Sequence, residues 1–116
     1  MPKKIVVAQD CTHLKRIIEE TVKRNGEKCN LNFIDVSKVA DMNGLFQFSK
    51  FNGDISKWDV SKVADMSMMF YHSDFNGDIS KWNVPLMTDL NKIFLFSALE
   101  DSGMVPGWYN MRKRFL

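Results

Sequence analysis

The chain has few of the residues on which many small proteins depend. Two cysteines and two histidines among 116 residues are too few for a disulfide framework or for a structural zinc site, which usually needs four ligands. No apolar run approaches the roughly 18 residues of a membrane span, and Gln9 and Asp10 interrupt the apolar start before a signal-peptide core can form. We therefore expect one domain, residues 1–116, in the cytoplasm, with no metal, no cofactor and no membrane span.

Charge of one sign is also lacking. The chain carries 16 basic and 14 acidic residues, which leaves a formal net charge of +2. This balance does not favour binding to nucleic acid or to a membrane surface. Apolar residues, in contrast, make up 45% of the chain, which is enough for a core in a domain of this size.

What the chain does have is a repeat with a period of 24 residues. The octapeptide from Phe51 to Trp58 returns letter for letter from Phe75 to Trp82. Residues 35–42 likewise return as residues 59–66, and a degenerate third copy follows at residues 83–90. Self-similarity at a fixed period is typical of stacked architectures. The sequence therefore predicts three coils, at residues 27–50, 51–74 and 75–98.

Within one coil, the apolar residues first step by two positions and then by three and four. They are Trp58, Val60, Val63, Met66, Met69 and Phe70. A step of two is typical of a strand, and steps of three and four place residues on one stripe of a helix. Ser61 is the predicted helix N-cap, and the equivalent Pro85 is compatible with a first helical turn. The predicted fold class is an α/β repeat, a short solenoid of three strand–helix coils.

One coil alone cannot bury its apolar face, so we expect neighbouring coils to stack Trp on Trp and Phe on Phe. Gly53 and Gly77 lie between Asn and Asp before each predicted strand. We interpret both glycines as turn residues, since glycine accepts a positive φ without steric cost.

The two flanks are predicted to cover the ends of the stack. Residues 1–26 form the N-terminal cap, with a short strand at residues 5–8 and an amphipathic helix at about 12–25. Asp10 or Thr12 is available to cap this helix and Gly26 to end it. Residues 99–116 form the C-terminal cap, which starts as a loop. Five of its side chains are then expected to pack on the third coil: Trp108, Tyr109, Met111, Phe115 and Leu116.

Residues 51–70 carry a family resemblance. The run FNGDISKWDVSKVADMSMMF resembles the repeat of BspA-like leucine-rich-repeat surface proteins, also known from mycoplasma lipoproteins. The resemblance extends over about residues 14–98. It implies a right-handed, leucine-rich-repeat-like solenoid and a bacterial interaction module, often secreted or surface-exposed. It implies no catalytic residue.

Two binding hypotheses follow from the strand face of the predicted coils. In the first, the chain is a non-enzymatic protein-binding module for an unknown protein partner. In the second, it is a glycan-binding or adhesin-type surface module that uses the stacked tryptophans and the columns of Asn52, Asp54, Asn76 and Asp78. Exposed tryptophans would favour the second hypothesis. The candidate binding residues are Lys57, Trp58, Asp59, Lys81, Trp82 and Asn83.

Other residues in register invite further interpretations. Columns such as Asp41, Asp65 and Asp89 could collect a cation, but we favour local roles in turns and at helix starts. His72 shares its repeat position with Phe48 and Phe96, which indicates a partly buried packing site. No nucleophile, base and orienting group share a spacing that would bring them together, so we predict that the chain is not an enzyme. A homodimer through the C-terminal end stays open.

Overall fold

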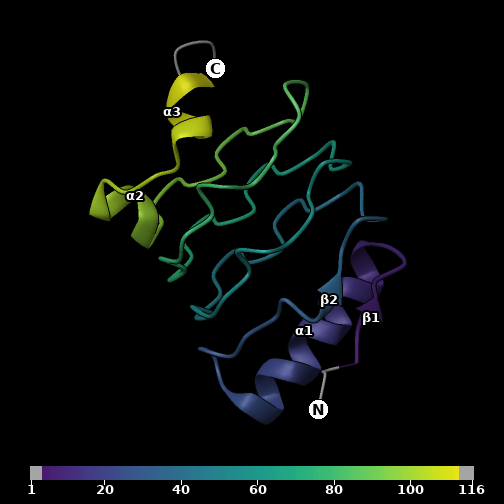
Figure 1. Cartoon of the computed structure of the whole chain (residues 1–116). Coiled ribbons are helices and arrows are strands. Elements are labelled where there is room, and N and C mark those ends of the chain that lie inside the picture. The colour runs from purple at the N-terminus through teal and green to yellow at the C-terminus, as the bar shows by residue number, and fades with distance from the viewer. Residues whose placement is uncertain (1–3, 113–116) are drawn as a thin grey trace.

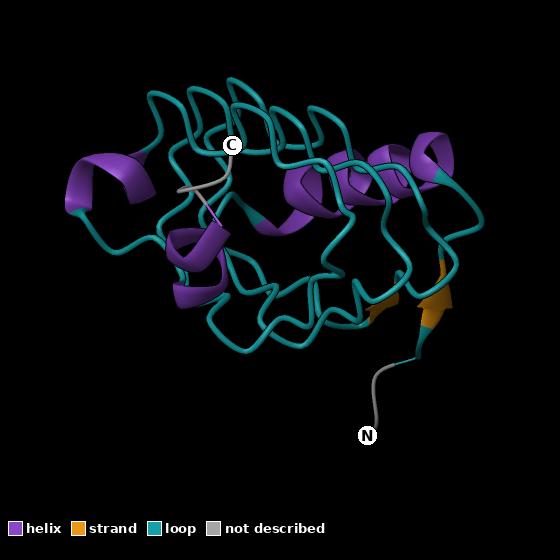
Figure 2. Cartoon of the chain, turned by 90° about the horizontal axis from the view of Figure 1, so that it is seen from above, coloured by secondary structure: helices purple, strands orange, loops and turns teal. Residues whose placement is uncertain are grey.

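The computed structural model describes residues 4–112 and consists mainly of turns and loops. Two short strands, β1 (Val6–Val7) and β2 (Ile34–Asp35), flank the helix α1 (Cys11–Asn25) in the chain. Two further helices follow late in the chain, α2 (Ala98–Ser102) and α3 (Gly107–Arg112). Helix α1 lies at one end of the molecule and α2 and α3 lie at the other, with the repeats between them (Figures 1 and 2).

The N-terminal segment forms a small β–α–β unit. Strands β1 and β2 are parallel, with Val6 opposite Ile34. The side chain of Asp10 caps α1 by accepting the backbone amide of His13 at 2.8 Å, and Gly26 ends the helix with φ of 89°. Both residues act as the sequence predicts. Helix α1 buries Leu14 and Ile18 against the first repeat.

Segments 24 residues apart in the chain lie side by side and are joined by backbone hydrogen bonds. Alternate amides of residues 42–48 donate to carbonyls of residues 65–71, and those of residues 66–72 donate to carbonyls of residues 89–95. The eight bonds measure 2.8–3.1 Å. The amides between them close local turns, as when Leu45 donates to the carbonyl of Met42. Each repeat is thus held both by its own turns and by its neighbour.

The predicted solenoid of three strand–helix coils, including its leucine-rich-repeat-like form, is wrong. Between residues 27 and 97 the structure has no α-helix, and β2 is the one strand of more than a single bridge. The side chain of Asp65 accepts the amide and the hydroxyl of Ser67, and such local bonds compete with helix formation. Met68 and His72 also have φ values of 56° and 52°, which no right-handed helix allows.

The residues predicted at the starts of these helices therefore have other roles. Ser61, the predicted N-cap, donates its amide and hydroxyl to the carboxylate of Asp59 at 3.0 and 2.6 Å. Pro85 accepts the amide of Thr88 in a turn.

The core is a stack of aromatic rings inside the repeats, as the period predicts. The ring of Phe70 lies 5.7 Å from Phe46 and 5.6 Å from Phe94, with interplanar angles of 10°. Phe51 and Phe75 stack beside them at 6.2 Å. All five rings are buried. The burial of large aromatic side chains contributes much of the stability of a protein core. The repeat places these side chains together inside the protein.

The predicted role of Gly53 and Gly77 is wrong, because neither has a positive φ. A Cβ atom on Gly53 would lie 1.8 Å from the backbone oxygen of Cys29. A Cβ atom on Gly77 would lie 2.7 Å from the ring of Phe75. Gly53 is needed because the neighbouring backbone lies too close for a side chain, and at Gly77 the space is taken by the ring of Phe75.

The C-terminal segment differs from its prediction at the start. Residues from Ala98 form helix α2 where a loop is expected, because the Ser97 hydroxyl accepts the amide of Glu100 as an N-cap. Trp108 and Tyr109 pack against the core as predicted, whereas Met111 is exposed. Phe115 and Leu116 lie outside the described residues.

Candidate functional site

The candidate residues Trp58 and Trp82 form a buried ladder. Their rings stack at 6.4 Å with an interplanar angle of 6°, and each residue is only 4% exposed. The indole nitrogens donate to the carbonyls of Leu31 and Ile55 at 2.9 and 3.0 Å. With both faces and the polar edge occupied inside the protein, these rings offer no platform on the surface.

Trp108 continues this ladder, which the sequence analysis did not foresee. Its ring lies 6.4 Å from Trp82 at 12°, and its nitrogen donates to the carbonyl of Ile79 at 2.9 Å. The spacing of 26 residues instead of 24 hides the relation. Helix α3 therefore supplies the third rung of the ladder.

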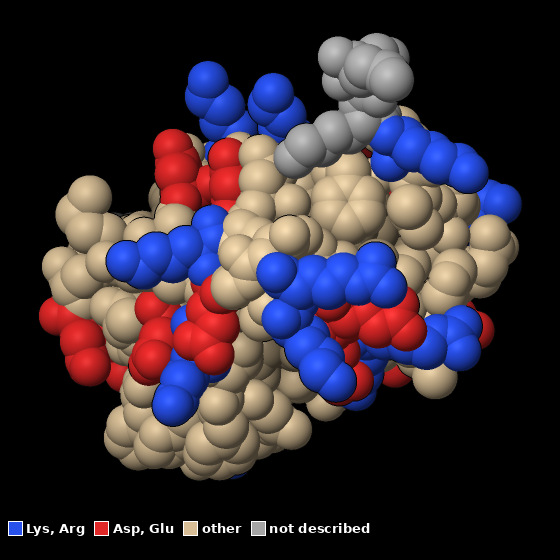
Figure 3. All heavy atoms as spheres, turned by 90° about the horizontal axis from the view of Figure 1, so that it is seen from below, with Lys and Arg blue, Asp and Glu red and all other residues tan. Residues whose placement is uncertain are grey.

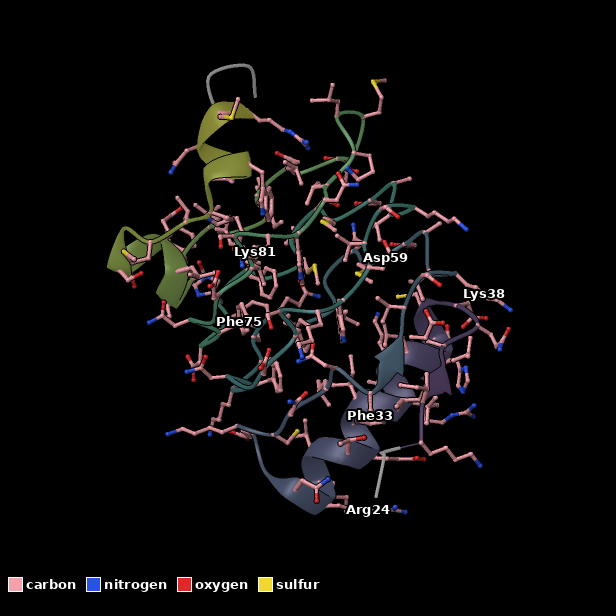
Figure 4. All side chains as sticks on the ribbon, in the orientation of Figure 1. Arg24, Phe33, Lys38, Asp59, Phe75 and Lys81 are labelled. Atoms are coloured by element: carbon pink, nitrogen blue, oxygen red, sulfur yellow. The ribbon has the colours of Figure 1, made fainter. Side chains whose placement is uncertain are left out.

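The four polar candidates, in contrast, are on the surface. Lys57, Asp59, Lys81 and Asn83 are all exposed, and Figure 4 shows Asp59 and Lys81 on the loops of successive repeats. The backbone at Lys57 is held in place, since its amide donates to the side chain of Asn32 at 2.9 Å.

The aspartate columns serve the turns. Asp54 and Asp78 each accept the amide and the hydroxyl of the serine two residues later, so their predicted turn role is confirmed. The pKa of Asp59 lies below its ordinary value because the hydroxyl and then the amide of Ser61 donate to the carboxylate. Asp65 also has a lowered pKa. Burial acts to raise it, but the hydrogen bonds from Ser67 and Asn43 outweigh burial. The proposed helix-dipole role of Asp65 is wrong, since no helix starts there.

Within residues 4–112, no group of three histidine, cysteine or acidic side chains is arranged to hold a metal ion. No helix in this part of the chain is long and apolar enough to cross a membrane. On the face shown in Figure 3, basic and acidic side chains are interspersed and do not separate into patches of one sign.

An exposed row of aromatic rings is the most unusual surface feature of the protein. Phe48 stacks on His72 at 5.1 Å between the rings, and Phe96 lies tilted against His72 at 4.8 Å and 37°. Tyr71 packs edge-on against Phe48 at 5.5 Å and against His72 at 4.5 Å. We call these four residues the aromatic ridge. Phe48 is 67% exposed and Phe96 56%.

The backbone beneath the aromatic ridge is strained. Phe48, His72 and Phe96 have φ values of 56°, 52° and 59°, a conformation that costs a residue other than glycine about 1–2 kcal/mol. Two large apolar rings and one imidazole are thus held in water at three strained positions. The sequence placed these residues in one column, but the prediction that His72 is partly buried is wrong, because His72 is exposed. The pattern of the sequence contains no signal for their exposure.

Taken together, the buried ladder, the hydrogen-bonded turns and the exposed ridge define a small repeat protein built around stacked aromatic side chains. A family model described as "Mycoplasma protein of unknown function, DUF285" matches residues 12–104. The match covers most of the chain, and the chain belongs to this family. No curated protein and no solved structure matches it.

Proposed function

We propose that the protein is a non-enzymatic module that binds another protein, and that the aromatic ridge is its contact surface. The exposure of Phe48 and Phe96 is the observation that carries the proposal. Aromatic residues are enriched in protein interfaces and among the residues that contribute most to binding. Folding alone gains little from rings that remain in water on a strained backbone.

The polar face of Lys57, Asp59, Lys81 and Asn83 is a second surface for the same function. All four side chains are exposed, and hydrogen bonds hold the backbone of Lys57 and the carboxylate of Asp59 in place. Pre-organised groups lose less entropy on binding. Exposed charges contribute less to affinity than aromatic anchors do, so we place this surface second. The resemblance of residues 51–70 to repeats of BspA-like surface proteins supports a binding role.

Glycan binding receives less support. The proposed platform consists of Trp58 and Trp82, which are 4% exposed and stacked on each other. A sugar ring needs access to an aromatic face, and these faces are covered. We therefore do not extend the proposal to glycans.

Affinity capture with defined variants tests the proposal. Asn replaces Phe48 and Phe96 in one variant, because Asn tolerates a positive φ better than most residues. Asn replaces Leu86 and Met87 in the control, since these residues are 86% and 93% exposed and lie outside the ridge. Wild type and both variants are immobilised and incubated with a mycoplasma lysate, and captured proteins are quantified by mass spectrometry. The main captured protein is then purified and its Kd measured.

Loss of two aromatic anchors should weaken binding by at least about 10-fold, whereas the control should bind as the wild type does. Equal binding by the ridge variant and the wild type contradicts the ridge as the contact surface. A third variant, Lys57→Glu with Lys81→Glu, then tests the polar face. If it also binds as well as the wild type, neither surface is the contact surface. The proposed function itself is wrong if the wild type captures no protein that binds the purified chain with a measurable Kd.

A further inference from the structure

A cleft of about 640 Å³ lies between α1, β1 and the segment that leads into β2. Its walls come from parts of the chain that the parallel strand pair brings together. Lys4 and Val6 line it from the β1 side, Arg16 and Arg24 from α1, and Phe33 from the residue before β2. Figure 4 shows Arg24 and Phe33 at this end of the molecule. The volume is in the range of small-molecule sites, about 300–1,000 Å³.

The polar part of the cleft is mainly cationic. Lys4, Arg16 and Arg24 contribute three positive charges, and Glu20 is the one acidic residue among the described residues of the lining. Arg16, Glu20 and Arg24 follow at intervals of four residues along one face of α1. Among the described residues, none of the three cations makes an ion pair. Their charge therefore remains available to a ligand.

His13 adds a neutral donor to the lining. Its Nδ1 atom accepts the backbone amide of Gln9 at 3.0 Å. An imidazole whose Nδ1 accepts a hydrogen bond carries its proton on Nε2. Because His13 also lines the cleft, this second nitrogen can donate to an anion.

The remaining walls are apolar. Val6, Ile17 and Phe33 all line the cleft and are half-buried. Ile17 lies on α1, the amphipathic helix of the predicted N-terminal cap, and part of its surface borders this cleft. A cationic wall beside a wall with an aromatic ring suits a ligand with an anionic end and a flat apolar body.

We infer that this cleft binds a small phosphate monoester with a flat ring system, such as a nucleoside monophosphate. Guanidinium groups bind phosphate through paired hydrogen bonds, and two arginines with a lysine match the double negative charge of a monoester. Phe33 provides the surface for the ring. A long nucleic acid fits less well, because such binding needs more phosphate contacts than one cleft provides. The inference is independent of the proposed protein-binding function.

Isothermal titration calorimetry with the full chain at physiological salt tests this inference. The probes are AMP, adenosine, inorganic phosphate and N-acetylphenylalanine, which pairs a carboxylate with a flat ring. AMP should bind at least about 10-fold more tightly than each of the other three. Adenosine lacks the phosphate, inorganic phosphate lacks the ring, and N-acetylphenylalanine carries one negative charge where the monoester carries two.

Two variants then localise the site. Arg16→Gln with Arg24→Gln should weaken AMP binding by at least about 10-fold. The control, Lys57→Gln with Lys81→Gln, removes the same amount of charge from a different surface and should leave AMP binding unchanged. Phe33→Leu should weaken the binding of AMP but not that of inorganic phosphate. The NMR signals of the His13 ring should shift with AMP in the wild type.

Several results would overturn the inference. Absence of AMP binding refutes it directly. An equal loss of affinity for AMP in the arginine variant and in the lysine control means that AMP binding depends only on the net charge of the protein. Equal affinity for AMP and N-acetylphenylalanine makes the cleft a carboxylate site. Thermal unfolding of each variant checks that the fold is intact. If the arginine variant does not fold, the Phe33→Leu variant and the NMR signals of the His13 ring in the wild type decide whether AMP binds in the cleft.

Discussion

Gly53 and Gly77 occupy the same position in two identical octapeptides, but we expect alanine to affect them differently. Neither glycine has a positive φ, so alanine brings no backbone strain at either site. The difference comes from the neighbouring atoms. At Gly53 the new Cβ would meet the backbone oxygen of Cys29 at 1.8 Å, and at Gly77 it would meet the ring of Phe75 at 2.7 Å.

The magnitude follows from what must move. To accommodate Gly53→Ala, segment 52–54 must move away from segment 27–31, to which three backbone hydrogen bonds of 2.7–3.2 Å join it. Each such bond contributes about 0.5–1.5 kcal/mol, so their loss costs about 3 kcal/mol. Gly77→Ala requires only that the Phe75 ring shift, since the nearest backbone oxygen is 3.4 Å away. Overpacking of this kind costs about 1–3 kcal/mol, and the loss at Gly77 should be in the lower part of this range because only a side chain has to move.

Urea unfolding followed by tryptophan fluorescence measures both changes. Gly107→Ala is the control, because no atom lies within 4 Å of a Cβ at that position, and its effect should stay within about 0.5 kcal/mol. We expect the free energy of unfolding to fall most for Gly53→Ala, less for Gly77→Ala and hardly at all for Gly107→Ala. An equal loss of free energy of unfolding in Gly53→Ala and Gly77→Ala would refute the close approach of segments 27–31 and 52–54.

Three further changes test other parts of the structure. Met68→Gly should raise the free energy of unfolding by up to about 1 kcal/mol in urea unfolding, because Met68 has φ of 56° where the preceding repeat has Gly44; a loss would contradict the strained turn. Trp82→Phe should lower it by about 1–3 kcal/mol, because a buried carbonyl loses its donor, and an unchanged urea midpoint would argue against the buried ladder. Ser61→Ala should raise the pKa of Asp59 towards its ordinary value, as followed by NMR titration. The lowered pKa stabilises the fold above about pH 4, and this contribution disappears as the pH falls through the folded pKa. The Ser61→Ala variant should therefore be less stable than the wild type above about pH 4. An unchanged pKa of Asp59 in the variant would contradict the assigned cause.

The repeat shows how much of the fold can be predicted from the sequence. The period of 24 residues placed Trp58 with Trp82 and Phe51 with Phe75, and the structure stacks both pairs. It could not show what the backbone does between them. Spacings of three and four residues occur in a helix, but they also occur in successive turns that each close with a bond to the third residue, as from Leu45 to Met42.

Only part of the candidate binding surface can be predicted from the sequence. Lys57 and Lys81 are exposed, as residues with charged side chains usually are. Phe48 and Phe96 were in the right column, but their exposure depends on a backbone with positive φ, which residue type alone would argue against. The sequence does not predict Trp108 as a residue of the tryptophan ladder, because two extra residues place it outside the 24-residue period.

By itself, the sequence determined the period, the pairs of residues that meet between repeats and the helix from Cys11 to Asn25, because each depends on local spacing and on apolar burial. The tertiary structure alone decided that alternate amides reach the neighbouring repeat instead of forming helices. It also decided which aromatic rings face water and where unpaired cations gather around a cleft. These features depend on the backbone conformation within each repeat and on the approach of segments that the repeat period does not relate, and the spacing of residue types specifies neither.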